Sequence, residues 1–271
     1  MTTTIGIISI KGGVGKTTTT TNLGAALASE FGQKVLLIDG NYSAPNLGLH
    51  FGVVKSEYTI LDVLQDKVPI EKAIHPSEFG FDFIPGMLMP KGIGKVEVFK
   101  LKSKLHSLKN KYDTILIDTS PSLNQELLSA MIASDYLIAV TSPDYPTLSC
   151  TIRAVNLAKQ KKTPIIGLVL NKVRGKRFEL SVKDIEELTE VPVIAVLQDD
   201  IKILEALSHT VPSVIKSGMS SNSVECKKLA AALAGMEYKD PRFLARMFSV
   251  FSKGDARKEE INRLILDKKR R

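Results

Sequence analysis

A glycine-rich segment with two lysines lies near the N-terminus and has the residue types needed to hold phosphate groups. Its sequence is Lys11-Gly12-Gly13-Val14-Gly15-Lys16-Thr17-Thr18. Glycines allow a tight turn whose N–H groups can point at phosphate oxygens, and the N-terminus of a following helix adds the positive end of its dipole. In such a loop the second lysine, Lys16, reaches the β- and γ-phosphates, and the Thr17 hydroxyl binds Mg²⁺. The segment therefore predicts a site for a nucleoside triphosphate.

Two aspartates each follow a buried apolar run and add to this chemistry. Asp39 follows residues 35–38, and Asp118 follows residues 114–117. The carboxyl ends of parallel strands form the edge of a sheet where α/β proteins bind ligands, so both carboxylates should lie there. Either one alone could be a helix N-cap. Together, beside a phosphate loop, they favour a magnesium site made by Asp39, Asp118 and Thr17, with water completing the shell.

These residues must be positioned by strands that alternate with helices. The expected strands are short apolar runs without alternation at 5–10, 35–38, 81–84, 114–117, 137–141, 164–170 and 193–196. The expected helices are patterns of helical periodicity at 17–31, 96–108, 124–133 and 148–160. Apolar runs of this kind are typical of strands buried on both faces, and their alternation with helices indicates a parallel sheet. We expect an α/β fold with a doubly wound, mostly parallel sheet and helices on both faces.

A basic tail follows the α/β body. Gly235 ends the last helical pattern of the body and Asp240-Pro241 marks a break, so we expect one domain at 1–238 and a tail at 239–271. The tail has eleven Lys or Arg against five Asp or Glu, hence +6 of the net charge of +8, which leaves +2 for residues 1–238. A basic tail suits a polyanionic partner, either a membrane surface or nucleic acid, although it can also be a solvated tail that aids solubility.

Composition excludes several classes of protein. Hydrophobic residues make up 44% and charged residues 24%, which is a globular composition rather than a disordered one. No apolar run approaches the ~20 residues of a membrane-spanning helix, and the start of the chain lacks the features of a signal peptide. The two cysteines, Cys150 and Cys226, are far apart, so no disulfide framework or CxxC pair is expected. The expected location is the cytoplasm.

The motif KGGVGKTT is a deviant Walker A motif, and through it the chain resembles the MinD/ParA family of dimeric ATPases over residues 4–236. The resemblance implies the P-loop NTPase fold, ATP and Mg²⁺ as cofactors, and a homodimer in the presence of ATP. It also implies that Lys11 crosses the dimer interface and touches the phosphates bound by the other subunit. A second cation of this kind stabilises charge on the transferring phosphoryl group, as an arginine finger does.

The segment 39–48 resembles switch I of that family, with one departure. The family pattern is Asp-x-Asp, whose second Asp positions the attacking water, and here that position is Asn41. An amide accepts a hydrogen bond from water but cannot take a proton near neutral pH. We therefore predict intact ATP binding with slow or partner-dependent hydrolysis, in which Lys11, Lys16 and Asn41 form the catalytic set. Asn46 matches the Pro-Asn-Leu element of the family and is expected near the nucleotide.

Recognition of the base is expected from two segments far from the loop. Asn171 ends a buried run and resembles the family's adenine-binding Asn, although an Asn at a strand end is often a simple turn residue. Residues 198–200 read Gln-Asp-Asp where relatives often have Pro-Glu-Asp, so Asp200 is the second expected base contact.

The tail contains a segment, 242–253, with a clear helical division. At about 100° per residue its six large apolar side chains fall within roughly 160°, and its basic side chains lie opposite. Such a helix is typical of an interfacial membrane helix, and it resembles in type and place the membrane-targeting helix of MinD proteins. The alternative is a helix docked on the protein's own body or in a partner's groove. We expect peripheral binding to an anionic membrane, at the inner face of the cell membrane.

Four functions follow from these observations. The first is a MinD-like switch ATPase that positions cell division or a related system, with an activating protein as a further partner. The second is a ParA-like partition ATPase that binds DNA, suggested by basic runs at 174–177, 159–162 and between Lys91 and Lys111. The third, an iron–sulfur carrier ATPase, is disfavoured because paired cysteines are absent from the sequence. The fourth is an ATP-locked binding module, suggested by Asn41 alone.

Overall fold

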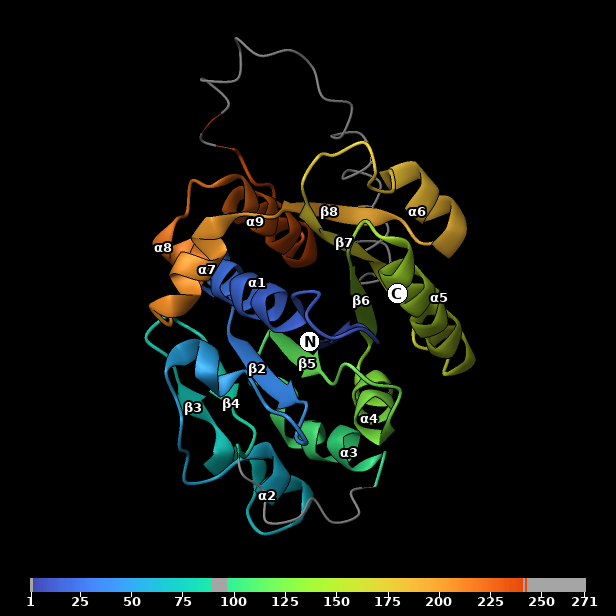
Figure 1. The fold of residues 1–271 in the computed structure, drawn as a ribbon. Coiled ribbons are helices and arrows are strands. Elements are labelled where there is room, and N and C mark those ends of the chain that lie inside the picture. The colour runs from blue at the N-terminus through green and yellow to red at the C-terminus, as the bar shows by residue number, and fades with distance from the viewer. Residues whose placement is uncertain (1, 89–96, 241, 243–271) are drawn as a thin grey trace.

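The computed structural model describes residues 2–88, 97–240 and 242, and a mostly parallel sheet crosses this part of the chain (Figure 1). Its strands, in chain order, are β1 (Thr3–Ile8), β2 (Val35–Gly40), β3 (His75–Pro76), β4 (Asp82–Ile84), β5 (Thr114–Thr119), β6 (Tyr136–Thr141), β7 (Ile165–Val173) and β8 (Val193–Gln198). Their spatial order is β3-β4-β2-β5-β1-β6-β7-β8, with only the β3–β4 pair antiparallel among them. From β1 the chain passes to β2 and β3 on one side and returns through β4 to β5. It then runs outward on the other side through β6, β7 and β8, which confirms the predicted doubly wound sheet.

Helices cover both faces of this sheet (Figure 1). They are α1 (Lys16–Phe31), α2 (Ile60–Leu64), α3 (Lys100–Leu105), α4 (Gln125–Ala133), α5 (Tyr145–Gln160), α6 (Val182–Thr189), α7 (Ile201–Ser208), α8 (Ser213–Lys216) and α9 (Ser221–Ala234). Short 3₁₀ turns occur at Gly48–Phe51, Ile70–Ala73 and His106–Leu108. One face carries α1 packed on α9, and the other carries α3 packed on α4 and α5 packed on α6.

The strands are apolar on both faces because each one contributes to two cores. In β2, Val35 and Leu37 pack with α1 and α9, whereas Leu36 and Ile38 pack with α2, α3 and α4. Successive side chains of a strand point to opposite faces, so a strand between two helical layers needs apolar residues at every position. This is why the sequence shows continuous runs rather than alternation.

Each predicted strand is present, but several ends differ. The first strand stops at Ile8 instead of residue 10, since the phosphate loop begins earlier than the apolar run suggests. Helix α5 starts at Tyr145, three residues before the prediction, because the Asp144 side chain accepts a hydrogen bond from the Thr147 N–H and caps it. The helix predicted at 96–108 is the shorter α3 followed by a 3₁₀ turn, with residue 96 outside the described residues.

Most of the predicted amphipathic tail lies outside the described residues, but its root does not. The Arg242 guanidinium lies on Asp240, with Nη2 2.9 Å from Oδ2, and Nη1 is 3.4 Å from the Ser221 hydroxyl at the start of α9. The Tyr238 ring meets Phe31 of α1 edge-on, with centroids 6.5 Å apart. Arg242, which the sequence places on the basic side of the predicted tail helix, thus contacts the body at Ser221, and the rest of that segment lies outside the described residues. No helix in the described parts of the chain is long and apolar enough to cross a membrane.

Candidate nucleotide site

The phosphate loop joins β1 to α1 and depends on two glycines in left-handed backbone conformations. Gly13 has φ +73° and Gly15 has φ +98°, a region that other residues adopt only with strain. Gly15 is the N-cap of α1, and a Cβ at this position would collide with the side-chain amide of Asn171. Lys16, the first residue of α1, is 7% exposed and lines the adjoining cleft. The backbone therefore brings the lysine and the helix N-terminus to one point.

The two predicted aspartates lie directly opposite each other on β2 and β5, as their matched register requires. Both are buried. Burial, reinforced by the neighbouring Asp118 charge, raises the pKa of Asp39 to about 7, although backbone N–H groups of Asn41, Asn46 and Leu47 donate to its carboxylate. Burial likewise raises the pKa of Asp118 to about 6, against the opposing effects of the Thr17 hydroxyl and Lys16. A cation at this point would offset the unfavourable juxtaposition of the two carboxylates.

The oxygen atoms around Asp118 suit Mg²⁺. The Thr17 hydroxyl donates to Oδ2 of Asp118 over 2.6 Å, whereas Oδ1 of Asp118 is buried without a hydrogen-bond partner. A buried carboxylate oxygen without a partner is uncommon in native proteins and indicates a binding position for an ion or a water molecule. Carboxylate and hydroxyl oxygens are the hard ligands that Mg²⁺ prefers. The residues present therefore fit the metal.

Asn41 has one side-chain acceptor without a hydrogen-bond partner. It is 6% exposed, and its Nδ2 donates to the carbonyl oxygen of Ala44, which fixes the orientation of the amide. Its Oδ1 is buried and has no hydrogen-bond partner. The residue lines the cleft, and an amide oxygen of this kind can accept a hydrogen bond but not a proton near neutral pH.

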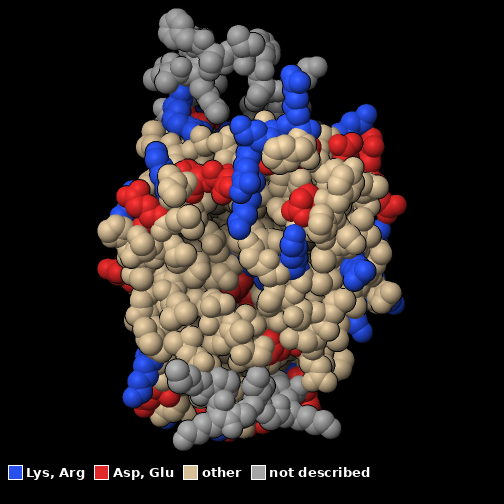
Figure 2. Space-filling view, viewed as in Figure 1, with Lys and Arg blue, Asp and Glu red and all other residues tan. Residues whose placement is uncertain are grey.

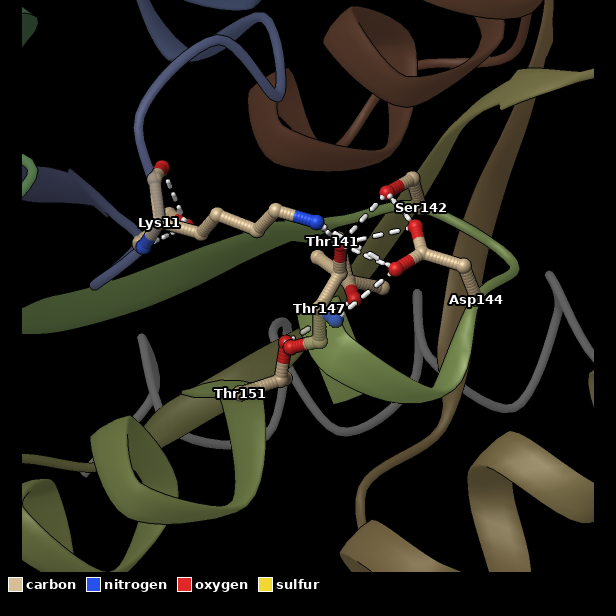
Figure 3. Close-up of polar contacts among 7 residues, drawn as sticks. Lys11, Thr141, Ser142, Asp144, Thr147 and Thr151 are labelled. Atoms are coloured by element: carbon tan, nitrogen blue, oxygen red, sulfur yellow. Dashed lines mark hydrogen bonds and ion pairs between the residues drawn. The ribbon is translucent and has the colours of Figure 1, made fainter. Parts of the chain in front are cut away.

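The other lysine of the loop, Lys11, is held outside this cleft by its own chain (Figure 3). Its Nζ lies 2.6 Å from the Thr147 hydroxyl and 3.3 Å from Oδ1 of Asp144, at the start of α5. Partial burial would raise the pKa of Asp144, but hydrogen bonds from Ser142, Thr147 and Lys11 prevail and lower it to about 2. Asp144 is therefore ionised at any ordinary pH and remains a partner for the ammonium group.

The far end of the cleft, which has a volume of about 540 Å³, is walled by side chains that the sequence did not single out. These are Leu49, His50, Ile203, Leu204 and Leu207. Burial lowers the pKa of His50 to about 4, so this imidazole is neutral and the wall carries no charge. An apolar wall beside a phosphate loop provides a place for the flat base of a nucleotide.

The two residues expected to contact the base both have partners within the protein. The Nδ2 atom of Asn171 donates to the carbonyl oxygen of Val14 over 2.8 Å, so Asn171 supports the phosphate loop. The carboxylate of Asp200 accepts the Lys202 N–H over 3.0 Å and caps α7. Both still line the cleft.

The rim at this end depends on contacts that no motif announced. The Asn222 side chain, on α9, exchanges two hydrogen bonds with the main chain of Gln198, over 2.7 Å and 2.9 Å. The guanidinium of Arg174 pairs with the carboxylate of Asp199 over 2.8 Å. An Asn near the start of a helix reads as an ordinary polar residue, and only the structure shows that it fixes the end of β8.

Most of the predicted residues thus gather at the carboxyl edge of the sheet. Those lining the cleft are Gly12, Gly13, Gly15, Lys16, Thr17, Thr18, Asn41, Asn46, Asn171 and Asp200. Val14 is buried behind the loop, and Asp39 and Asp118 are buried at the strand ends beside it. Lys11 is the member that its own chain turns away from the cleft.

Comparison with known proteins agrees with this geometry. The sequence model of a family described as an AAA domain matches residues 2–166. The septum site-determining protein MinD of a Synechocystis species is 32% identical over 249 residues, covering 88% of this chain and 92% of that protein.

Solved structures give the same result. Septum site-determining protein MinD of Pyrococcus horikoshii, complexed with Mg-ADP, has 35% identity and a TM-score of 0.80, covering 85% of this chain and 95% of that one. A MinC:MinD cell division protein complex of Aquifex aeolicus contains a chain with 28% identity and a TM-score of 0.76, covering 88% of this chain and 97% of that one. With its phosphate loop, opposed aspartates and doubly wound sheet, this chain belongs to the MinD/ParA family of P-loop ATPases.

Proposed function

We propose that the protein is an ATP-dependent dimerising switch ATPase that positions cell division or a related system. The observation that supports this most directly is that the two lysines of the phosphate loop lie in different places. Lys16 lines the cleft, whereas Lys11 is held outside it on α5. A lysine with no task in its own cleft is available to the phosphates held by a second copy.

ATP and Mg²⁺ are the proposed ligands. The phosphates lie at the loop and the N-terminus of α1, where Lys16 neutralises them. Thr17, Asp39 and Asp118 hold the metal, which when bound supplies positive charge to the triphosphate. The related MinD of Pyrococcus horikoshii was solved with Mg-ADP, which supports the same ligand class here. Asn46, Asn171 and Asp200 are proposed to lie around the nucleotide.

Hydrolysis is proposed to be slow or to need an activating partner. The free Oδ1 of Asn41 can orient a water molecule, but a neutral amide cannot accept its proton. At this position the chain therefore has a group that can orient water but no group that can act as a general base. If hydrolysis were absent altogether, the protein would be an ATP-locked binding module, the alternative that the same residue suggests.

Dimerisation requires that Lys11 leave Asp144 and Thr147. In a two-fold symmetric dimer each protomer donates the same group to its partner, so both lysines must be released. The terminal phosphate of ATP competes with the Asp144 carboxylate for the ammonium group, whereas ADP lacks that phosphate. This gives a physical reason for pairing in the presence of ATP and separation after hydrolysis.

Size-exclusion chromatography with light scattering tests this scheme. The wild-type chain should be a dimer with a non-hydrolysable ATP analogue and a monomer with ADP. Lys11→Ala should remain monomeric in both. Asp144→Asn, which keeps an oxygen for the cap of α5 but removes the charge that holds Lys11, should dimerise at a lower protein concentration. An unchanged dimer in Lys11→Ala would contradict the proposal.

Membrane association is proposed through the segment 242–253, at the inner face of the cell membrane. Basic residues near an anionic surface contribute ~1 kcal/mol each, and one short helix binds only marginally on that scale. Two helices in one dimer gain effective concentration, worth a factor of ~10²–10⁴. Because Arg242 is already bound to Asp240, the membrane-facing charge begins beyond it. Co-sedimentation with anionic liposomes should require ATP and should disappear when residues 243–271 are deleted.

DNA binding remains the second candidate, and charge pairing favours the membrane over it. Among the described residues, five cations in the basic runs of the body form ion pairs: Lys159 with Glu190, Arg174 with Asp199, Lys100 and Lys104 with Asp66, and Lys111 with Glu71. On the face shown in Figure 2, blue and red side chains interleave and do not form a surface of one sign. A ParA-like protein would bind DNA with a steep salt dependence even without residues 239–271. Fluorescence anisotropy on such a truncated chain would reveal that binding.

A protein partner is the last element proposed. A relative from Aquifex aeolicus was solved as a MinC:MinD cell division protein complex, which supports a comparable partner here. Such a partner, or another activator, would stimulate hydrolysis of the dimer.

A further inference from the structure

The loops that follow the two aspartate-bearing strands, β2 and β5, are joined by a buried glutamate on α4. The Oε2 atom of Glu126 accepts a hydrogen bond from the Ser43 hydroxyl over 3.0 Å, and Ser43 lies in the loop after β2. The same oxygen accepts the Nδ2 of Asn124 over 3.4 Å, and Asn124 ends the loop after β5. Glu126 is 6% exposed, whereas Ser43 is exposed, so the contact between them is partly buried. One carboxylate oxygen thus bridges the loops that follow Asp39 and Asp118.

The bridge ends in the turn that orients Asn41. Residues 41–44 form a tight turn in which the Ala44 N–H donates to the Asn41 carbonyl over 3.3 Å and the Asn41 side chain donates back to the Ala44 carbonyl. Ser43 is inside this turn. Tyr42 is 3% exposed and packs in the layer of α2, α3 and α4. Tyr42 and Ser43 together hold the turn against α4, and the orientation of the Asn41 amide depends on that turn.

The other arm of the bridge fixes the loop after β5. Besides Glu126, the Nδ2 atom of Asn124 donates to the Ser120 hydroxyl over 3.1 Å, two residues after Asp118. The Oδ1 atom of Asn124 accepts the Leu127 N–H over 3.0 Å and caps α4. The start of α4 is therefore tied to the loop that follows Asp118 and β5.

Glu126 also stabilises the N-terminus of its own helix. It lies in the first turn of α4, where an acidic side chain is stabilised by the helix dipole. In residues 2–88, 97–240 and 242 no lysine or arginine forms an ion pair with it. A residue that served the helix alone would need no contact with Ser43 of a different loop.

We propose that Glu126 is a positioning residue for hydrolysis: by tying Ser43 to Asn124, it holds the Asn41 amide in place and couples the loops that follow the two strands bearing the metal ligands. The effect on hydrolysis rests on the proposed ATPase function, whereas the tie between the loops does not. A change in one of these loops is transmitted to the other through this contact.

Hydrogen exchange of the nucleotide-free chain measures the tie, and single-turnover ATP hydrolysis measures its consequence. Glu126→Ala should speed exchange of peptides covering 41–47 about fivefold, the factor expected for one net hydrogen bond, and should lower the single-turnover rate constant by a similar factor without a matching rise in KM. Ser43→Ala should produce the same change in exchange. Exchange at 41–47 in the double variant should be no faster than in Glu126→Ala, because both substitutions remove the same Ser43–Glu126 hydrogen bond.

Two variants separate positioning from helix stability. Glu126→Gln keeps an oxygen that can accept from both Ser43 and Asn124, so it should retain wild-type exchange at 41–47 and most of the rate. Asp184→Ala removes an acidic residue from the first turn of α6, away from the cleft, and should lower thermal stability without altering exchange at 41–47.

The proposal is overturned if Glu126→Ala leaves exchange at 41–47 unchanged, or if exchange rises while the rate constant stays at the wild-type value. Glu126→Gln behaving like Glu126→Ala in exchange would also overturn it, since the oxygen bridge would then be irrelevant. A wild-type chain that binds no ATP would contradict the proposed function and leave the exchange result as an independent test of the tie.

Discussion

The two ends of the nucleotide cleft are built in different ways. At the phosphate end, one contiguous stretch, residues 11–18, supplies the loop and the start of α1, and two opposed strands supply the carboxylates. At the base end, the lining comes from residues 49–50, 171–172 and 198–207, which lie far apart in the chain. The charged side chains at the phosphate end, Lys16, Asp39 and Asp118, are buried, whereas the base end has exposed apolar side chains such as Leu204, 61% exposed.

The difference follows from what each end must hold. A triphosphate needs several N–H groups and charges at fixed positions, which only one compact loop with special backbone angles provides. A base needs a flat apolar space and a few polar contacts, which many combinations of side chains provide. Substitutions should therefore have larger effects at the phosphate end. Affinity for inorganic tripolyphosphate, which lacks a base, separates the two ends from each other.

The largest expected effect comes from completing the phosphate end. Asn41→Asp supplies the missing proton acceptor, and general bases contribute ~10²–10⁴-fold. We expect at least a ~10²-fold faster single-turnover hydrolysis, measured by release of labelled phosphate. Asn46→Asp, an Asn to Asp change in the same loop, is the matched control and should give no such gain. An unchanged rate in Asn41→Asp would show that the missing carboxylate is not what limits hydrolysis.

The next effect concerns the backbone of the phosphate loop. Gly15→Ala would impose left-handed strain of ~1–2 kcal/mol and a collision with the Asn171 amide, so affinities for ATP and tripolyphosphate should both fall by at least ~30-fold. Gly13→Ala carries a similar strain but meets no atom within 4 Å, so the loss should be about tenfold. Isothermal titration measures both. Equal losses in the two variants would refute the role assigned to the Asn171 contact.

Gly32→Ala is the control for backbone strain outside the site. Gly32 also has a positive φ, +62°, and ends α1 far from the loop. This variant should lower the free energy of unfolding by ~1 kcal/mol and leave nucleotide affinity unchanged.

A smaller effect is expected at the base end. Asn222→Ala removes two hydrogen bonds from the main chain of Gln198. These bonds position the rim of the cleft from within the protein, so only part of their energy should appear in binding, and ATP affinity should fall about fivefold. Tripolyphosphate affinity should stay the same, because the phosphate loop is untouched. Asn156→Ala, on the exposed side of α5, is the matched control. A parallel fall in tripolyphosphate affinity would mean that the two ends are not independent.

The smallest effect belongs to the exposed rim. Arg174 and Asp199 form an ion pair with side chains 58% and 42% exposed, and such pairs contribute only ~0.2–1 kcal/mol. Arg174→Ala should weaken ATP binding by less than about threefold. The difference from wild type should vanish in 0.5 M salt, where exposed charges are screened. A larger loss that persists in high salt would place Arg174 in direct contact with the nucleotide.

The same contrast explains what the sequence could predict. Residues 11–18 are recognisable because the chemistry demands particular residue types at fixed spacing, and Asp39 and Asp118 because they end continuous apolar runs. The sheet was predictable for the second reason. The contacts of Asn222 and Glu126 could not be predicted. Asn222 bonds to a residue 24 positions away and Glu126 to one 83 positions away, both through ordinary polar side chains. Such contacts depend on which elements become neighbours, and no local pattern records that.

The tether of Lys11 to Asp144 and Thr147 has a consequence for copy number in the cell. Under the two-fold arrangement proposed above, two identical tethers must be released together, so their free-energy costs add. With a factor of about three per half-exposed contact, the dissociation constant of the pair rises roughly ninefold. The chain would then stay solitary up to a roughly ninefold higher abundance than it would without the tethers.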